Sequence, residues 1–143
     1  MPTSPARTLL SREKRSKNMK AIRSRDTKPE LSLRRALHGA GYRYRLHVAS
    51  LPGKPDLVFP RFSAVIEVRG CFWHGHTCAE GHLPKSNKSY WLPKLARNKQ
   101  RDLENERAIK ALGYRLNVVW ECELDSKKKI DQIVLKLSRW LEM

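Results

Sequence analysis

A short segment rich in cysteine, histidine and aromatic residues constrains the fold of this chain more than any other feature. Residues 71–78 read Cys-Phe-Trp-His-Gly-His-Thr-Cys, and the remaining cysteine lies far away at position 122. Two thiolates and an imidazole from the segment, joined by a third thiolate, make a Cys₃His set for a tetrahedral structural zinc. The spacing is tighter than in ordinary zinc fingers, so this is not a finger. The predicted zinc ligands are Cys71, His76, Cys78 and Cys122.

Two other readings of these cysteines stay open: free buried thiols beside a surface histidine, or a disulfide with one cysteine left over. The zinc hypothesis is favoured because it uses all three cysteines of the chain. His74 falls outside the ligand set and can simply be packed. Phe72 and Trp73 can be core residues, or they can protrude from a rigid turn and insert between base pairs.

The charge of the chain points to a polyanionic partner. Thirty Lys and Arg against fourteen Asp and Glu give a net charge of +16 in 143 residues, and such a field attracts polyanions. Nucleic acid is favoured over an anionic membrane or a merely basic protein. No stretch approaches the ~20 apolar residues of a membrane helix, and the N-terminal residues lack the apolar core of a secretory signal. We therefore expect a cytoplasmic protein with no membrane partner.

The pattern of apolar and turn residues predicts a mixed α/β architecture. Residues 1–25 are expected to form a basic arm, with a weak helix that orders against something acidic, and residues 26–143 a single domain. Thr27 and Glu30 predict a capping box that opens a helix, which Gly39 and Gly41 end. The remaining elements are predicted as strands at 42–46, 56–59, 64–68 and 114–120, and helices at 91–112 and 127–141.

The predicted hairpin carries a candidate site. If its turn is centred between Arg61 and Phe62, Asp56 lies directly opposite Glu67. Two like charges so placed repel each other unless something compensates, and a divalent cation can do so. Arg69 lies on the same face and can neutralise a phosphate. The pattern resembles the PD-(D/E)xK nuclease signature with Arg in place of Lys, although a loop Asp and a solvated Glu would often produce it.

Several longer motifs resemble the very-short-patch-repair DNA endonucleases. They are Gly-Lys-Pro-Asp-Leu-Val at 53–58, Gly-Cys-Phe-Trp-His-Gly-His-Thr-Cys at 70–78 and Val-Val-Trp-Glu-Cys-Glu-Leu at 118–124. Arg-Ser-Lys-Asn-Met at 15–19 and Thr-Lys-Pro-Glu at 27–30 also match. The likeness runs from about residue 12 to residue 125 in the same order and spacing. It implies a restriction-endonuclease-like mixed sheet flanked by helices, a structural Zn²⁺, and Mg²⁺-dependent nicking of one strand beside a T:G mismatch.

The resemblance also implies roles for individual residues. Asp56 would bind Mg²⁺, His74 would be the general base with Asp102 as its partner, and Glu30 would approach the metal through water. The proposed metal role of Glu30 competes with its role in the capping box. Without the resemblance, Asp102 would be interpreted as a solvated charge on the surface of a helix. The residues implied to contact DNA are the aromatic wedge Phe72, Trp73 and Trp91, then Met19 on the arm, Lys94 and Asn98, with Arg69 on phosphate.

The chain departs from the family pattern beside the hairpin carboxylates. Val68 stands where Thr is familiar, although its backbone carbonyl can still bind Mg²⁺, and Glu67 stands where an apolar residue is familiar. Glu67 would add a catalytic or metal-binding carboxylate, so one or two Mg²⁺ ions remain open. The alternatives are a related nuclease acting on other lesions or sites, and a non-catalytic zinc-stabilised DNA-binding module. Mismatch-repair factors or a cytosine methyltransferase are conceivable partners, and we expect a monomer.

Overall fold

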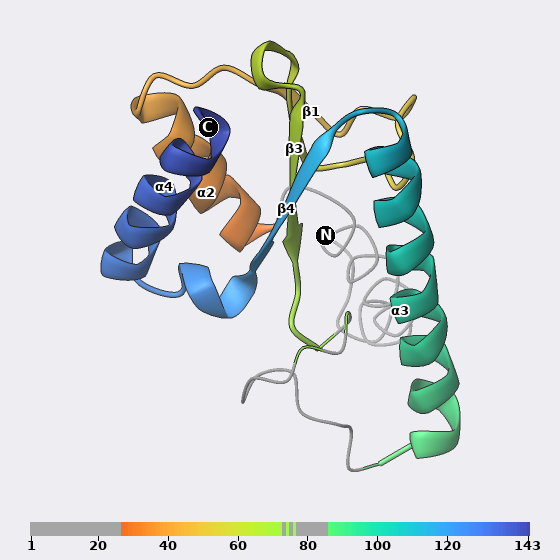
Figure 1. Ribbon diagram of the computed structural model, residues 1–143. Coiled ribbons are helices and arrows are strands. Elements are labelled where there is room, and N and C mark those ends of the chain that lie inside the picture. Colours follow the sequence, from red (N-terminus) through yellow and green to blue (C-terminus); the bar gives the residue numbers. More distant parts are fainter. Residues whose placement is uncertain (1–26, 73, 75, 77–85) are drawn as a thin grey trace, which may run out of the picture.

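A four-stranded sheet separates two helical layers in the computed structural model (Figure 1). The structure describes residues 27–72, 74, 76 and 86–143. Helices α2 (Lys28–Gly39) and α4 (Lys127–Leu141) cover one face of the sheet, and α3 (Lys88–Ala111) lies against the other. The predictions for the arm at 1–25 with Met19, and for Trp73 and Cys78, lie outside the described residues.

The sheet is mixed, as the sequence predicts. Its order is β1 (Arg45–Leu46), β2 (Leu57–Phe59), β3 (Ala64–Arg69) and β4 (Arg115–Trp120). The first three strands run antiparallel, whereas β3 and β4 pair in parallel. A parallel pair needs a crossover connection, and α3 supplies it. The order of elements is therefore the predicted α-β-β-β-α-β-α within the described residues.

The hairpin of β2 and β3 is covered on both faces, so apolar side chains of these strands are buried on both sides of the sheet. The larger core cluster lies between the sheet and the α2–α4 layer. The smaller cluster faces α3 and contains Val58, Val65 and Ile109. Alternate residues of the strands thus enter different clusters, which the twofold period of a strand dictates. The larger cluster consists of Leu33, Leu37, Leu57, Phe59, Ala64, Ile66, Val119, Leu124, Leu137 and Leu141.

The register of the β2–β3 hairpin is the predicted one. Leu57 pairs with Ile66, and Phe59 pairs with Ala64. A short 3₁₀ turn, η1 (Pro60–Phe62), closes the hairpin, and the left-handed backbone of Ser63 (φ 48°) returns the chain to β3. Continued by one residue, this register sets Asp56 opposite Glu67, so the hairpin presents both carboxylates at the same end of the sheet.

Only half of the predicted capping box forms. Thr27 is the N-cap of α2, and its hydroxyl accepts a hydrogen bond from the Glu30 N–H at 3.4 Å. The Glu30 carboxylate instead contacts Arg34 and His47. The prediction of a reciprocal box is corrected here, because stronger charged partners lie within reach of the carboxylate than the N-cap amide.

The boundaries of two other elements differ from the prediction. Residues 42–46 form a strand only at Arg45 and Leu46, because Tyr42 and Tyr44 pack against the larger core cluster before the chain pairs with β2. Helix α3 begins at Lys88, three residues early, with Pro93 inside it. The prediction for α4 is confirmed at both ends. In the described part of the chain, no helix is both long and apolar enough to cross a membrane.

Candidate active site

A cavity of about 570 Å³ opens between β3 and α3. It brings together four of the five predicted catalytic residues from three parts of the chain: Asp56 and Glu67 from the hairpin, His74 from the loop after β3, and Asp102 from α3. The predicted DNA contact Asn98 also lines it and is 7% exposed. The remaining lining residues include the cations Lys54, Arg69 and Arg101.

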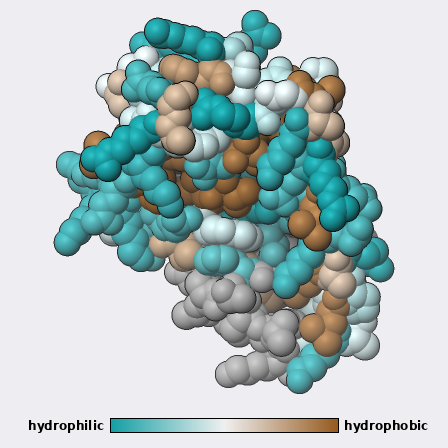
Figure 2. All heavy atoms as spheres, in the orientation of Figure 1, coloured by the Kyte–Doolittle hydropathy of each residue, from teal (hydrophilic) through white to brown (hydrophobic). Residues whose placement is uncertain are grey.

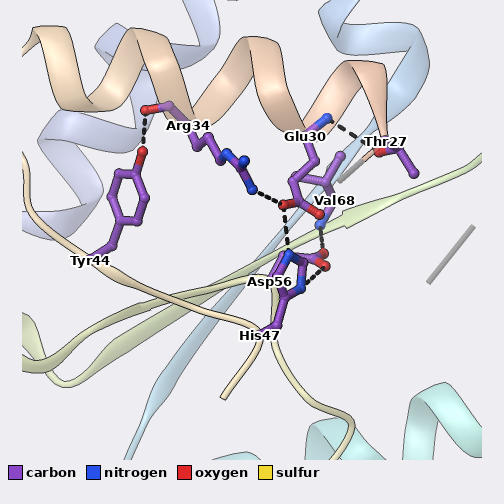
Figure 3. A network of polar contacts seen from close by, with 7 residues as sticks. All are labelled: Thr27, Glu30, Arg34, Tyr44, His47, Asp56 and Val68. Carbon is purple, nitrogen blue, oxygen red and sulfur yellow. Dashed lines mark hydrogen bonds and ion pairs between the residues drawn. The ribbon is translucent and has the colours of Figure 1, made fainter. Parts of the chain in front are cut away.

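Three polar side chains meet around Asp56, which lines the cavity, and Figure 3 shows them close together. Glu30 from α2 is almost fully buried, and its Oε2 lies 3.0 Å from Nε2 of His47. The other ring nitrogen of His47 lies 3.7 Å from Oδ1 of Asp56. The backbone N–H of Val68 donates to Oδ2 of Asp56 at 2.7 Å, which fixes that carboxylate. One donor atom from each of Glu30, His47 and Asp56 lies within 4.8 Å of the others, so the three can hold a metal ion.

Burial raises the pKa of Asp56 to about 8, and the neighbouring Glu30 and Glu67 carboxylates push it in the same direction. The Val68 N–H opposes this effect by stabilising the charged form. A buried carboxylate beside two others is costly to ionise unless a cation compensates. The Asp56 carboxyl therefore favours binding either a proton or a cation.

Glu67 has a different partner from Asp56. Its Oε2 accepts hydrogen bonds from both Nε and Nη2 of Arg69, at 3.1 and 2.7 Å. Burial raises the pKa of Glu67, and Arg69 counteracts the shift. Arg69 is only 7% exposed, lies 3.8 Å from Glu106 of α3 and stacks near the Trp120 ring. Arg69 thus holds Glu67 at the cavity instead of extending into solvent.

His74 and Asp102 form the shortest polar contact at the cavity. Nδ1 of His74 lies 2.6 Å from Oδ2 of Asp102, and both side chains keep contact with solvent, at 24% and 18% exposure. Helix α3 positions Asp102, whereas His74 follows β3 directly, and its N–H donates to the Gly70 carbonyl. The sequence singled out both residues, and the structure makes them neighbours.

Three of the four predicted zinc ligands lie together. One donor atom each from Cys71, His76 and Cys122 falls within 4.8 Å of the others. The His76 ring stacks on Trp120 with centroids 4.1 Å apart, and the Cys71 N–H donates to Glu121 at 2.8 Å. The group ties the loop after β3 to η3 (Glu121–Leu124), which follows β4.

Aromatic side chains gather where α3 begins. The Phe72 and Trp91 rings meet edge to face at 5.3 Å, and Tyr90 contacts Trp91 at 4.9 Å. The ammonium of Lys94 lies over both Tyr90 and Trp91. Tyr90 and Leu92, on either side of Trp91, are 58% and 42% exposed. Figure 2 shows the surface to be mostly hydrophilic, with hydrophobic patches at its lower right, over this end of α3.

Sequence reasoning missed His47 and the contact of Glu106 with Arg69. A signal for His47 was present. Leu46 pairs with Leu57, so the next position along β1 lies opposite Asp56, and the His47 N–H indeed donates to the Asp56 carbonyl. Extending the hairpin register to one more strand would have found it. Glu106 offered no such signal, because it is one of many charges on α3.

Comparison with known proteins identifies the family. A sequence model described as DNA mismatch endonuclease Vsr matches residues 8–80, just over half of the chain. The chain belongs to the Vsr family. It is 52% identical over 115 residues to the Type II nicking enzyme V.XorIIP of Xanthomonas oryzae pv. oryzae, covering 80% of this chain and 85% of that one. It is 40% identical over 129 residues to the DNA mismatch endonuclease Vsr of Escherichia coli, covering 89% and 83%.

A third relative, the Type II nicking enzyme V.NmeAIP of Neisseria meningitidis, is 44% identical over 119 residues, covering 83% of this chain and 85% of that one. Membership of the Vsr family makes this chain a DNA endonuclease, as the sequence motifs imply. The alternative of a non-catalytic DNA-binding module is thereby set aside. The mixed sheet with helices on both faces fits an α/β nuclease.

Proposed function

We propose that this Vsr-family chain is a Mg²⁺-dependent endonuclease that nicks one strand beside a T:G mismatch in very short patch repair. The observation that carries the proposal is the cavity, which holds the Asp56 carboxylate together with the His74–Asp102 pair. The name of the Escherichia coli relative supports action on a mismatch. The net charge of +16 supports binding of a DNA backbone.

The donors around Asp56 fit Mg²⁺. Carboxylate oxygens are the ligands this ion prefers, and Asp56 and Glu30 place two of them beside each other. The pKa of Asp56, raised by burial and by the neighbouring Glu30 and Glu67 carboxylates, supports binding of a cation beside it. Glu67 and the Val68 carbonyl remain proposed further ligands. When bound, Mg²⁺ supplies Lewis-acid charge to the phosphodiester.

His74 would take the proton of the attacking water. Asp102 accepts a hydrogen bond from Nδ1–H of His74 in this scheme, which leaves Nε2 as the proton acceptor. The carboxylate of Asp102 then stabilises the imidazolium that forms. Lys54 and Arg101 on the cavity wall would hold phosphates without reading sequence. Arg69, also proposed to face phosphate, would act mainly by holding Glu67 in place.

The cluster of Cys71, His76 and Cys122 fits a structural zinc. Cys71, His76 and Cys122 supply three of the four ligands that such a site needs, and Cys78 is the proposed fourth. A zinc ion there would fasten the loop after β3. That loop carries both His74 and Phe72, so the zinc site would position the proposed base and part of the wedge together.

Recognition would rest on the aromatic wedge. Phe72, Trp73 and Trp91 would insert beside the mismatch, where a wobble pair costs less to unstack than a matched pair. Lys94 and Asn98, one and two turns further along α3, would follow the base edges. We propose that residues 1–25 form a DNA-contacting arm through Met19, and that residues 26–143 form a single endonuclease domain.

The test is nicking of end-labelled duplexes in Mg²⁺, one with a central T:G mismatch and one fully paired. Asp56→Ala should abolish cleavage, whereas the matched control Asp131→Ala, exposed on α4, should not change it. A nick beside the mismatch in one strand supports the proposal. Absence of cleavage by folded protein, or metal-independent cleavage, contradicts it.

A second candidate is nicking at a defined site or at another lesion. The relatives named Type II nicking enzymes favour it. Equal cleavage of the paired duplex at a fixed sequence would support this candidate over mismatch repair. A mismatch-repair factor or a cytosine methyltransferase remains a proposed partner under either reading.

A further inference from the structure

His47 lies between the two buried carboxylates of the candidate metal site. Its ring nitrogens lie 3.0 Å from Oε2 of Glu30 and 3.7 Å from Oδ1 of Asp56, and its side chain is 16% exposed. The three residues come from different places: α2, the turn after β1 and the position just before β2 (Figure 3). Their convergence therefore depends on the tertiary fold and not on a single local motif.

The backbone holds His47 in this position at a conformational cost. Its φ of 48° is left-handed, which non-glycine residues rarely adopt. Its N–H donates to the Asp56 carbonyl at 3.1 Å, so the main chains of the two residues are joined as well as their side chains. Strained residues persist where the surrounding structure fixes them, often at functional sites. Here the strained backbone points an imidazole at the Asp56 carboxylate.

The donor set differs from one that would select Mg²⁺ alone. Mg²⁺ prefers oxygen ligands, whereas imidazole nitrogen favours divalent transition ions. We propose that a ring nitrogen of His47 joins Glu30 and Asp56 in a mixed nitrogen–oxygen cation site, which binds divalent transition ions more tightly than Mg²⁺. The proposal rests on the proposed function, because Asp56 is the cation ligand in both, and it adds a third ligand and a metal preference.

The probe is Mn²⁺, which reports its ligands by electron paramagnetic resonance. Protein without DNA is first given one equivalent of Zn²⁺, which should occupy the Cys71–His76–Cys122 cluster because cysteine thiolates favour this ion. It is then titrated with Mn²⁺ or Mg²⁺. Wild type should bind Mn²⁺ at least about tenfold more tightly than Mg²⁺, and the bound Mn²⁺ should show hyperfine coupling to an imidazole nitrogen.

His47→Gln replaces the nitrogen donor with an amide oxygen. It should lose the nitrogen coupling and most of the preference for Mn²⁺, while still binding Mg²⁺. His38→Gln, an exposed histidine at the end of α2, is the matched control and should behave as wild type. His47→Asn, which tolerates left-handed backbone better, serves if the Gln variant does not fold.

Two outcomes overturn the proposal. One is bound Mn²⁺ without nitrogen coupling, which would make His47 an ion-pair partner of the carboxylates and no ligand. The other is a preference for Mn²⁺ that survives in His47→Gln. Nicking in Mg²⁺ is measured separately: wild type that nicks but lacks the nitrogen signal refutes the His47 ligand alone, whereas absence of nicking counts against the proposed function.

Discussion

Replacing Asp102 by asparagine tests the proposed base more sharply than removing His74. The carboxylate lies 2.6 Å from Nδ1 of His74, and it would stabilise the imidazolium formed in the transition state. A hydrogen bond to a charged partner contributes about 1.5–3 kcal/mol, and partial exposure of both side chains places this one near 2 kcal/mol. That value corresponds to a loss of about 30-fold in rate. If the asparagine amide also donates to Nδ1, Nε2 keeps its proton, and the loss extends toward the ~10⁴-fold limit of general-base catalysis.

The assay is single-turnover nicking of the T:G duplex at saturating protein, with DNA affinity measured separately. Asp102→Asn, His74→Ala and the double variant are compared, with Asp131→Asn on α4 as the control for a lost exposed carboxylate. Residues that act as one unit are not additive, so the double variant should be no slower than His74→Ala. The reasoning is refuted if Asp102→Asn nicks within threefold of wild type, or if the two losses multiply.

Three further predictions concern stability. With a chelator present, the raised pKa of Asp56 means that, between about pH 4 and 8, this carboxyl is protonated in the folded state and ionised in the unfolded state. The free energy of unfolding should therefore fall as the pH rises across that range. Asp56→Asn should flatten the slope of the urea-unfolding free energy against pH, and an equal slope in both proteins would contradict this prediction. Arg115 donates to three backbone carbonyls, two of them at the end of α4, at 2.6, 2.9 and 3.3 Å, so Arg115→Ala should lower stability by about 2–3 kcal/mol and Tm by roughly 5–10 °C, with exposed Arg139→Ala as control. Cys122→Ser should lower both bound zinc, by atomic absorption, and Tm, and an unchanged zinc content would count against the Cys₃His site.

Local patterns allowed the hairpin to be predicted because its alternation and its turn depend on neighbouring residues. Strand β2 and the first three residues of β3 are apolar, and one register places Asp56 opposite Glu67, as the structure has it. The bounds of α2 followed from its cap and stop residues, and those of α4 from its apolar face, for the same reason. The Cys71–His76–Cys122 group was predicted because few other residues could supply such ligands.

Partner choice among charged residues could not be predicted in the same way. Glu30 turns from its N-cap toward Arg34 and His47, and Glu67 turns to Arg69. Each choice depends on which opposite charge the tertiary fold brings within 3 to 4 Å, and the sequence offers thirty Lys and Arg as candidates. The left-handed backbone of His47 is equally invisible, because no glycine or asparagine marks it.

Helix α3 carries residues from both parts of the proposed reaction. Trp91 of the proposed wedge and Asp102 beside the proposed base lie on the same helix. They are eleven residues apart, which corresponds to about 16 Å at a rise of 1.5 Å per residue. The helix therefore fixes the distance between these two residues. If the proposed wedge enters the duplex and the proposed site cuts it, this spacing predicts a constant offset between the inserted aromatic residues and the cut, which a change in the length of this helix should alter.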